Sequence, residues 1–385
     1  MKSYTLLLTL CLSFLVGCTE PMRPEFDFKS GLVSVEGFVS TTRGSSFVRL
    51  SEINEFNIGV NRFVNVFIPG AQVSFLNTTT GNVVELIENE EAEIYMPPTD
   101  FVAMVGETWE LEVVLSNGKV YRSLPETIIE PVAISDISAT FNPELVYNLG
   151  WDDFVPGHSI QIDFEDPPGS ENFYYWNYRS FERKDICAAC YDAHIYRGGT
   201  CIPVDPYPLR PETIPIHTYY CESDCWRIRY NQNIFIFNDR FSDGLSIAKF
   251  PVGNVLLYTK KDILVEVQQF SLSASAYEYY ETLKDIIDDN GGFNSPPSAA
   301  LIGNMFSPGD PTEFVLGRFT AASSWVARTF LERSTIQLDP LENVVSVPEG
   351  TWSVPFPPEE YVFYAPCPGE SRYNTSIRPE GWPTN

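Results

Sequence analysis

The sequence predicts a mainly β protein: an immunoglobulin-like or transthyretin-like β-sandwich over residues 31–130, then a larger β-rich domain over residues 131–385. We expect the second domain to contain one helix and a cysteine-rich insertion at about residues 184–231. Three observations support this class. Apolar and polar residues alternate with a period of two in most segments, turn residues separate these segments, and a single later segment has helical periodicity.

The first 17 residues have the form of a secretory signal peptide, with Lys2 followed by an apolar run from Leu6 to Val16. The run ends in Leu-Val-Gly before Cys18, which resembles a bacterial lipobox. We therefore expect cleavage before Cys18 and lipidation of that cysteine. Each buried methylene of an acyl chain contributes about 0.8 kcal/mol of membrane affinity, so that the lipid alone would anchor the protein.

Residues 18–30 are polar and rich in proline, as expected of a tether that leads away from a lipid surface. Thr19, rather than an aspartate, follows the lipidated cysteine, which favours the outer membrane over retention at the inner membrane. The acidic Glu20 favours the cell surface over the periplasmic face.

The charge composition excludes one class of partner. The chain has 51 acidic residues against 25 lysines and arginines, with a formal net charge of −26 at pH 7. Because nucleic-acid binding requires a basic footprint, we do not expect nucleic acid as a partner.

In the first half, residues 32–40 alternate as a strand, and two more strands are predicted on either side of a Thr-Gly-Asn turn at residues 80–82. A hairpin is predicted around Asn117-Gly118, because this dipeptide tolerates the positive φ angles of a tight turn. A domain boundary is expected near Pro131, where one alternating series gives way to another.

In the second half, two strands are predicted on either side of the Asp-Pro-Pro-Gly-Ser turn at residues 166–170. Strand patterns return after the insertion. The helix is expected to begin with Ser275 as its N-cap and to stop at Gly291. The tail from Leu338 alternates short strands with prolines.

The chain resembles the domain of unknown function 4249 family, lipoproteins of Bacteroidota, in the order and spacing of its motifs over nearly all of the mature sequence. Those motifs are the lipobox with its tether, LVSVEGFVS, PGAQVSF, GETWELEV with SNGKVYRS, the cysteine-rich insertion, NDRFSDG, AYEYYETLK with GGFNSPPSAALIGN, and FVLGRFTA. The resemblance implies an accessory lipoprotein of a TonB-dependent outer-membrane receptor. It supplies no catalytic residues.

Six cysteines remain once Cys11 leaves with the signal and Cys18 is lipidated: Cys187, Cys190, Cys201, Cys221, Cys225 and Cys367. Their even number and the oxidising compartment predict disulfides, although the spacing does not choose among fifteen pairings. Two alternatives stay open: a zinc site built from the insertion cysteines with His217, and a redox-active Cys187-Cys190 pair. We expect disulfides, with no metal and no cofactor.

Aromatic residues of the insertion and of the strand before it are the candidates for contact with a ligand. They are Tyr175, Trp176, Tyr219, Tyr220 and Trp226. Exposed tyrosine and tryptophan rings can stack on sugars or anchor a partner protein. Because alternate side chains of a strand point to opposite faces, at least half of the aromatic run at residues 173–178 is expected in the core.

The motifs of common enzymes are absent from the sequence. It contains no HExxH, GxSxG, GxxxxGK[ST] or GxGxxG, and none of its three histidines has a spacing that would bring two imidazoles to one helix face. The acidic groups at residues 163–166 and 285–289 lack the signature of a calcium loop, so we expect solvated charges there.

These observations lead us to expect a non-enzymatic binding or assembly lipoprotein of the outer membrane, acting beside a TonB-dependent receptor in nutrient uptake. A small molecule, glycan or peptide is the expected cargo. The alternatives are a surface hydrolase of carbohydrates or peptides, which would use carboxylates that the sequence does not locate, and an envelope scaffold.

Overall fold

The computed structural model describes residues 31–57, 61–90, 92–148, 152–191, 194–203, 217–231, 233–288, 303–341, 364–368 and 373–384. Strands dominate these residues, and α2 (Ala274–Asp288) is the one α-helix among them. The predicted mainly β class with a single helix is therefore confirmed. Cys18, the signal peptide and the tether lie outside the described residues, as does Gly291.

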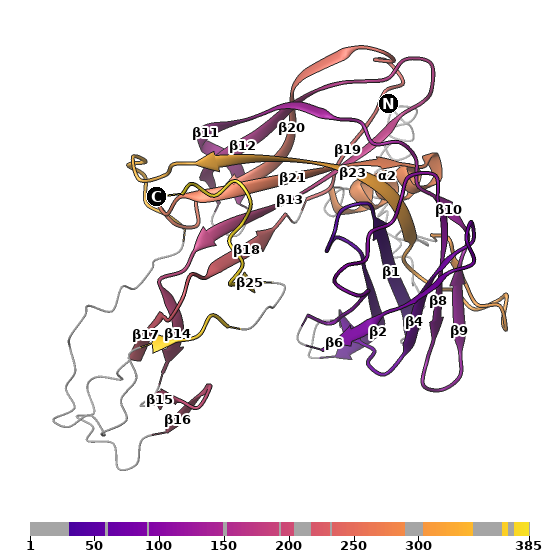
Figure 1. The fold of residues 1–385 in the computed structure, drawn as a ribbon, viewed down its shortest axis with the longest axis horizontal. Helices are drawn as coiled ribbons and strands as arrows, with labels where there is room; N and C mark the ends of the chain where they lie inside the picture. The colour runs from indigo at the N-terminus through magenta and orange to yellow at the C-terminus, as the bar shows by residue number, and fades with distance from the viewer. Residues whose placement is uncertain are drawn as a thin grey trace, which may run out of the picture.

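One large sheet runs through the whole molecule and joins its two ends (Figure 1). In spatial order its strands are β25 (Asn374–Thr375), β18 (Trp226–Tyr230), β13 (Phe173–Arg183), β21 (Ile263–Leu272), β23 (Phe319–Leu331), β1 (Leu32–Ser40), β2 (Phe47–Asn57), β7 (Ile94–Met96) and β6 (Ile87–Asn89), with β19 (Phe235–Asn238) beside β13 and β3 (Asn61–Phe67) beside β2.

At one end, a six-stranded sheet covers β1 and β2 and completes a β-sandwich. Its strands are β22 (Met305–Phe306), β9 (Val120–Ser123), β8 (Thr108–Val114), β4 (Gln72–Asn77) and β5 (Val83–Glu85), with β10 (Glu126–Thr127) beside β8. Val35 and Leu50 on one layer share a core with Phe75 and Leu111 on the other. The predicted β8–β9 hairpin is confirmed, with Gly118 at a φ of 85° in its turn.

A three-stranded sheet covers the other end of the large sheet. Its strands are β11 (Ile134–Asn148), β12 (Asp153–Glu165) and β20 (Ser246–Leu256). β12 and β13 are the two strands predicted around residues 166–170, and both form. They lie in different sheets, so the turn carries the chain from one layer to the next.

The period of two in β13 decides which layer each ring enters. Tyr174 and Trp176 are fully buried in the core shared with the three-stranded sheet. The intervening Tyr175 points to the opposite face, where its ring stacks on Tyr280 of α2 with 4.9 Å between centroids.

The helix is capped by Ser273, whose Oγ accepts a hydrogen bond from the Ala276 amide at 3.2 Å, and not by Ser275 as predicted.

The first core is completed by residues from the far end of the chain. β1 pairs in parallel with β23, and β22 adds to the edge of β9. Met305, Val315 and Phe319 are buried in the same core as Val35. A division of the chain near residue 130 therefore leaves part of this core beyond the boundary.

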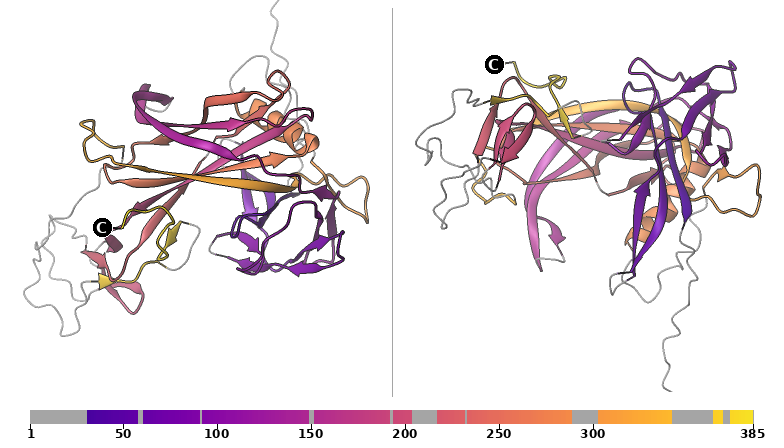
Figure 2. Two further views of the ribbon diagram at one scale, coloured as in Figure 1. Left: turned by 45° about the horizontal axis from the view of Figure 1, so that its top comes forward. Right: turned by 90° about the horizontal axis from the view of Figure 1, so that it is seen from below.

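The cysteine-rich insertion forms a projection at the opposite end of the molecule from the sandwich, as both views of Figure 2 show. We call it the hook. It consists of a three-stranded sheet of β14 (Ile186–Cys190), β17 (His217–Cys221) and β24 (Tyr364–Ala365), with a hairpin of β15 (His194–Arg197) and β16 (Thr200–Pro203). No helix within the described ranges has the length and apolar character to cross a membrane.

Candidate functional site: a disulfide-stapled hollow in the hook

Three disulfides hold the hook together, and they use all six cysteines of the predicted set. The pairs are Cys187–Cys221, Cys190–Cys201 and Cys225–Cys367. The two cysteines of the CxxC motif have different partners and form no redox pair. The sulfurs of Cys187, Cys221 and Cys225 lie within 4.8 Å of one another, but each is consumed by a disulfide, so no thiolate remains for zinc.

The segment between Cys221 and Cys225 is fixed at both ends. The Cys221 amide donates a hydrogen bond to the Asp185 carbonyl at 2.9 Å, and the Lys184 amide donates one to the Cys225 carbonyl at 2.8 Å. The Glu222 amide donates a third to the carbonyl of Ala365. With a disulfide at each end as well, the three residues between the cysteines form a loop that is held rigidly above the sheet.

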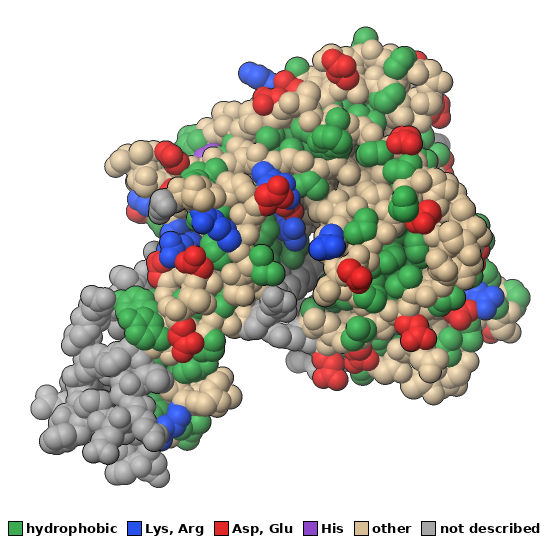
Figure 3. Space-filling model, viewed as in Figure 1, with side chains coloured by type: hydrophobic (Ala, Val, Ile, Leu, Met, Phe, Trp, Pro, Cys, Tyr) green, Lys and Arg blue, Asp and Glu red, His purple; other side chains and the backbone are tan. Residues whose placement is uncertain are grey.

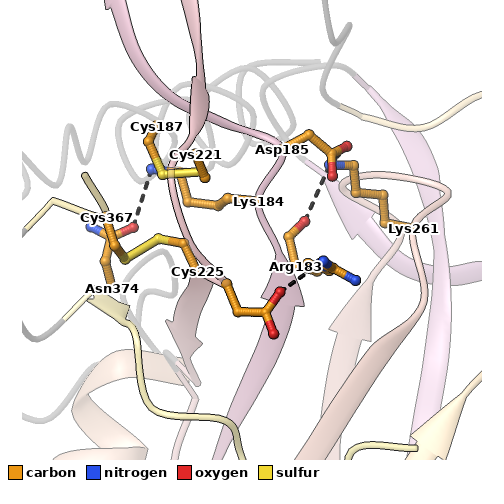
Figure 4. Close-up of a disulfide and its surroundings, with 10 residues drawn as sticks. Arg183, Lys184, Asp185, Cys187, Cys221, Cys225, Lys261, Cys367 and Asn374 are labelled. Carbon is orange, nitrogen blue, oxygen red and sulfur yellow. Dashed lines mark hydrogen bonds and ion pairs between the residues drawn. A yellow bond between two sulfur atoms is a disulfide. The ribbon is translucent and has the colours of Figure 1, made fainter. Parts of the chain in front are cut away.

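This loop borders a surface hollow of about 600 Å³. Such a volume falls within the range of roughly 300–1,000 Å³ that is typical of ligand pockets. The hollow is lined by Arg183, Lys184, Asp185, Tyr220, Cys221, Glu222, Ser223, Asp224 and Tyr364. Figure 4 shows the Cys187–Cys221 and Cys225–Cys367 disulfides with Arg183, Lys184 and Asp185 beside them.

Two tyrosine rings stand on one side of the hollow. β17 and β24 are parallel neighbours that place Tyr220 opposite Tyr364, with ring centroids 6.4 Å apart and planes at 48°. Tyr220 is 41% exposed and Tyr364 is 54% exposed. The rings therefore form an open aromatic corner that a bound molecule can contact.

The other side of the hollow carries paired charges. Arg183 forms an ion pair with Asp224 at 2.7 Å, and Lys261 forms one with Asp185 at 2.6 Å (Figure 4). Lys184 donates a hydrogen bond to the Asn374 side chain at 3.3 Å. Burial, and then the nearby cations Arg227 and Lys261, lower the pKa of Lys184 below its usual value.

These cations belong to a wider group. Figure 3 shows Lys and Arg side chains gathered between the hook and the sandwich, with Asp and Glu among them. On the large sheet, Glu266 of β21 accepts hydrogen bonds from Arg179 of β13 and Arg328 of β23 at 2.6 and 2.8 Å. These cations of the large sheet are therefore paired with carboxylates, as Arg183 and Lys261 are at the hollow.

The predicted ligand-contact residues fall into two groups. Trp176, Tyr219 and Trp226 are buried, with exposed fractions of 0%, 1% and 2%, and Tyr175 is stacked under α2. These four rings pack in cores and offer no open face to a ligand. Tyr220 alone lines the hollow.

The sequence did not single out Arg183, Asp185, Lys261 or Tyr364 as site residues. They come from three separate segments, and the sheet topology and the Cys225–Cys367 disulfide bring them together. Tyr364 stands three residues before Cys367, which is the one local signal that would have linked it to the insertion.

The acidic group at residues 163–166 is not simply a set of solvated charges as predicted, because Asp166 is 3% exposed. Asp166, Asp239 and Asp243 lie close together, but backbone amides of neighbouring loops hold all three. Asp166 accepts from Gly244, Asp239 from Asn172, and Asp243 from Gly169, while the Tyr174 hydroxyl also donates to Asp166. This arrangement fastens the β12–β13 turn to the β19–β20 loop. Asp163 accepts from the Lys249 amide instead.

Comparison with known proteins gives one match. A family model described as a domain of unknown function (DUF4249) matches residues 19–327. No curated protein and no solved structure matches the chain. The matched range includes most of the hook and the first core, and it ends before Tyr364 and Cys367.

Proposed function

Because this chain belongs to the DUF4249 family, which carries no assigned activity, we propose its function from the geometry of the hook and from the N-terminal lipobox. The protein is a lipid-anchored binding protein of the outer membrane, and it serves as a non-enzymatic accessory of a TonB-dependent receptor. It faces the cell surface and presents its hook to cargo or to the receptor.

The observation that carries this proposal is the rigid hollow at the end of the molecule opposite the sandwich. Disulfides and backbone hydrogen bonds fix its loop before any partner arrives. A preorganised surface loses little conformational freedom on binding. A lipid anchor at Cys18 would add a high local concentration beside the receptor.

The geometry favours binding over catalysis. Two of the three carboxylates that line the hollow, Asp224 and Asp185, are paired with Arg183 and Lys261. Those of the acidic group near Asp166 hold loops together. A glycoside hydrolase requires an acid of raised pKa and a second carboxylate about 5–10 Å from it. Burial raises the pKa of Asp166, but its carboxyl group accepts hydrogen bonds from Gly244 and Tyr174 and does not line the hollow.

The test is an affinity purification of the full-length, Cys18-lipidated protein from gently solubilised native outer membranes, with mass spectrometry of the co-purifying proteins. The expected result is a TonB-dependent receptor in stoichiometric amount. A Cys18→Ser variant, which cannot be lipidated, should lose both the membrane fraction and the receptor. Recovery of the lipidated protein alone would contradict the accessory function.

A further inference from the structure

The hollow combines three features that together specify the chemistry of a ligand: open aromatic rings, paired charges and a fixed loop. The ligand class that these features fit rests on the proposed function, because it belongs to the same surface.

The lining of the hollow contains two cations, Arg183 and Lys184, and three anions, Asp185, Glu222 and Asp224. Lys261 lies outside the lining but pairs with Asp185, so that the formal charges balance once it is included. A charged ligand gains little from ions that already face an opposite charge in water, since such exposed pairs leave little net field. The site therefore favours a ligand without net charge.

The ion pairs still have hydrogen-bonding capacity. The Arg183 and Asp224 side chains are 52% and 54% exposed, and those of Lys261 and Asp185 are 36% and 61% exposed. A guanidinium has five N–H donors and a carboxylate has about four acceptor positions, so each pair can still donate and accept. A hydroxyl group, which is both donor and acceptor, matches such a pair.

The aromatic corner supplies the complementary contact. The face of a tyrosine ring is electron-rich and binds apolar C–H groups, while its edge can remain wet. Tyr220 and Tyr364 present two such faces at an angle beside the ion pairs. A molecule with C–H faces and a rim of hydroxyl groups would contact both sides of the hollow at once.

We propose that this hollow binds a neutral oligosaccharide, with sugar rings against Tyr220 and Tyr364 and hydroxyl groups hydrogen-bonded to the Arg183–Asp224 and Lys261–Asp185 pairs. The volume of about 600 Å³ accepts more than one small ring, and the open shape suits a segment of a longer chain.

The experiment is isothermal titration calorimetry of the full mature chain in detergent micelles. The probes are maltohexaose, xylohexaose and cellohexaose as neutral sugars, tetragalacturonate as an anionic sugar, and hexaglutamate as an acidic peptide. Binding of at least one neutral probe at micromolar to millimolar concentration is expected, with weaker binding of both anions. Failure of every neutral probe, or tighter binding of an anion, overturns the proposal.

Variants locate the binding. Tyr220→Ala and Tyr364→Ala should each weaken the neutral probe about tenfold, which corresponds to about 1.4 kcal/mol. Tyr191→Ala is the matched control, since this hook tyrosine is 58% exposed but does not line the hollow, and it should leave affinity unchanged. Thermal unfolding of each variant verifies that the hook remains folded. Unchanged affinity in a folded Tyr220→Ala/Tyr364→Ala double variant overturns the proposal.

The calorimetry needs no receptor, so it is separable from the purification described above. If sugar binds but no receptor co-purifies, the proposed function fails and this inference stands. If the receptor co-purifies and no neutral sugar binds, the inference alone fails.

Discussion

Arg318 and Glu126 form an ion pair in the interior of the protein, with side chains that are 5% and 7% exposed. Glu126 belongs to β10, and Arg318 directly precedes β23. The Glu126 carboxylate also accepts hydrogen bonds from Ser273 at 2.9 Å and from the Asn304 amide at 3.2 Å. One buried carboxylate thus ties together β10, the start of α2, the segment before β22 and the start of β23.

Removal of one partner of this pair is expected to destabilise the protein strongly, because the other charge remains buried. Glu126→Gln or Arg318→Met should lower the free energy of unfolding by about 3–5 kcal/mol, and the double variant Glu126→Leu/Arg318→Met should recover most of this loss. Urea denaturation of each variant measures this change in the free energy of unfolding. Glu36→Gln, which removes the exposed partner of Arg49, is the control and should cost less than about 1 kcal/mol. Equal effects in the buried and exposed pairs would contradict the prediction.

Gly317 allows the closest approach between the two halves of the chain. Its φ is +88°, and a Cβ at this position would overlap the Val35 carbonyl oxygen. The neighbouring Leu316 exchanges backbone hydrogen bonds with Val33 and Val35 at 2.9 and 2.8 Å. Gly317→Ala should therefore lower the free energy of unfolding by at least about 2 kcal/mol.

The matched control is Gly309→Ala, because a Cβ at Gly309 meets nothing within 4 Å. Chemical denaturation of both variants should show a loss for Gly317→Ala only. A Gly317→Ala protein as stable as the parent would mean that β1 and the segment before β23 separate without cost.

The three disulfides should contribute unequally to stability. In the chain-entropy model, stabilisation grows with the length of the closed loop. Cys225 and Cys367 are 142 residues apart, whereas Cys190 and Cys201 are 11 apart. Replacement of the first pair by serine should cost about 5 kcal/mol, and replacement of the second about 3 kcal/mol. Denaturation with and without a reductant tests this, since the reductant should remove the difference between parent and variants.

Stability should depend on pH through His158. This side chain is buried, and its burial, together with the positive charge of Arg333, lowers its pKa from 6.5 to about 4. Protons therefore bind the unfolded chain more readily than the folded one. The stabilisation is complete above pH 6.5 and is lost as the pH falls towards 4, by up to about 3 kcal/mol.

His158→Phe removes this titration and should flatten the stability of the protein between pH 6.5 and pH 4 relative to the parent. The ring of Phe141 lies 5.2 Å from the His158 ring, so an aromatic replacement keeps the packing. His194→Phe on β15 is the control and should preserve the slope of the parent. The prediction fails if the two variants have the same pH profile.

The sequence could predict the strands, but it could not predict which side chains of each strand pack against which neighbouring layer. The alternation along β13 requires that about half of its rings enter a core. It cannot tell which half, because both faces of this strand are covered, one by the three-stranded sheet and the other by α2. For the same reason the sequence does not distinguish Tyr219, which is buried, from its neighbour Tyr220 in β17, which is exposed.

The helix cap illustrates another limit. Ser273 and Ser275 are equivalent as local cap signals, but Ser275 lies beside the buried ion pair. Its hydroxyl accepts a hydrogen bond from Arg318 at 3.0 Å and lies 3.5 Å from a Glu126 oxygen. The Ser273 hydroxyl donates to Glu126 and still accepts from the Ala276 amide, whereas the Ser275 hydroxyl accepts from Arg318 instead. The disulfide pairing could not be predicted from the sequence either, since it is the parallel pairing of β17 and β24 that brings Cys367 to the hook.

The parallel pairing of β1 with β23 also constrains the order in which the protein can fold. Ser40 and Ser324 share a hydrogen bond of 3.1 Å across a sequence separation of 284 residues. Contacts of such high contact order form slowly, because a long loop must close before they stabilise anything. The amino-terminal sandwich gains the last residues of its core, among them Met305, Val315 and Phe319, only when the segment around β23 has been synthesised and has paired with β1.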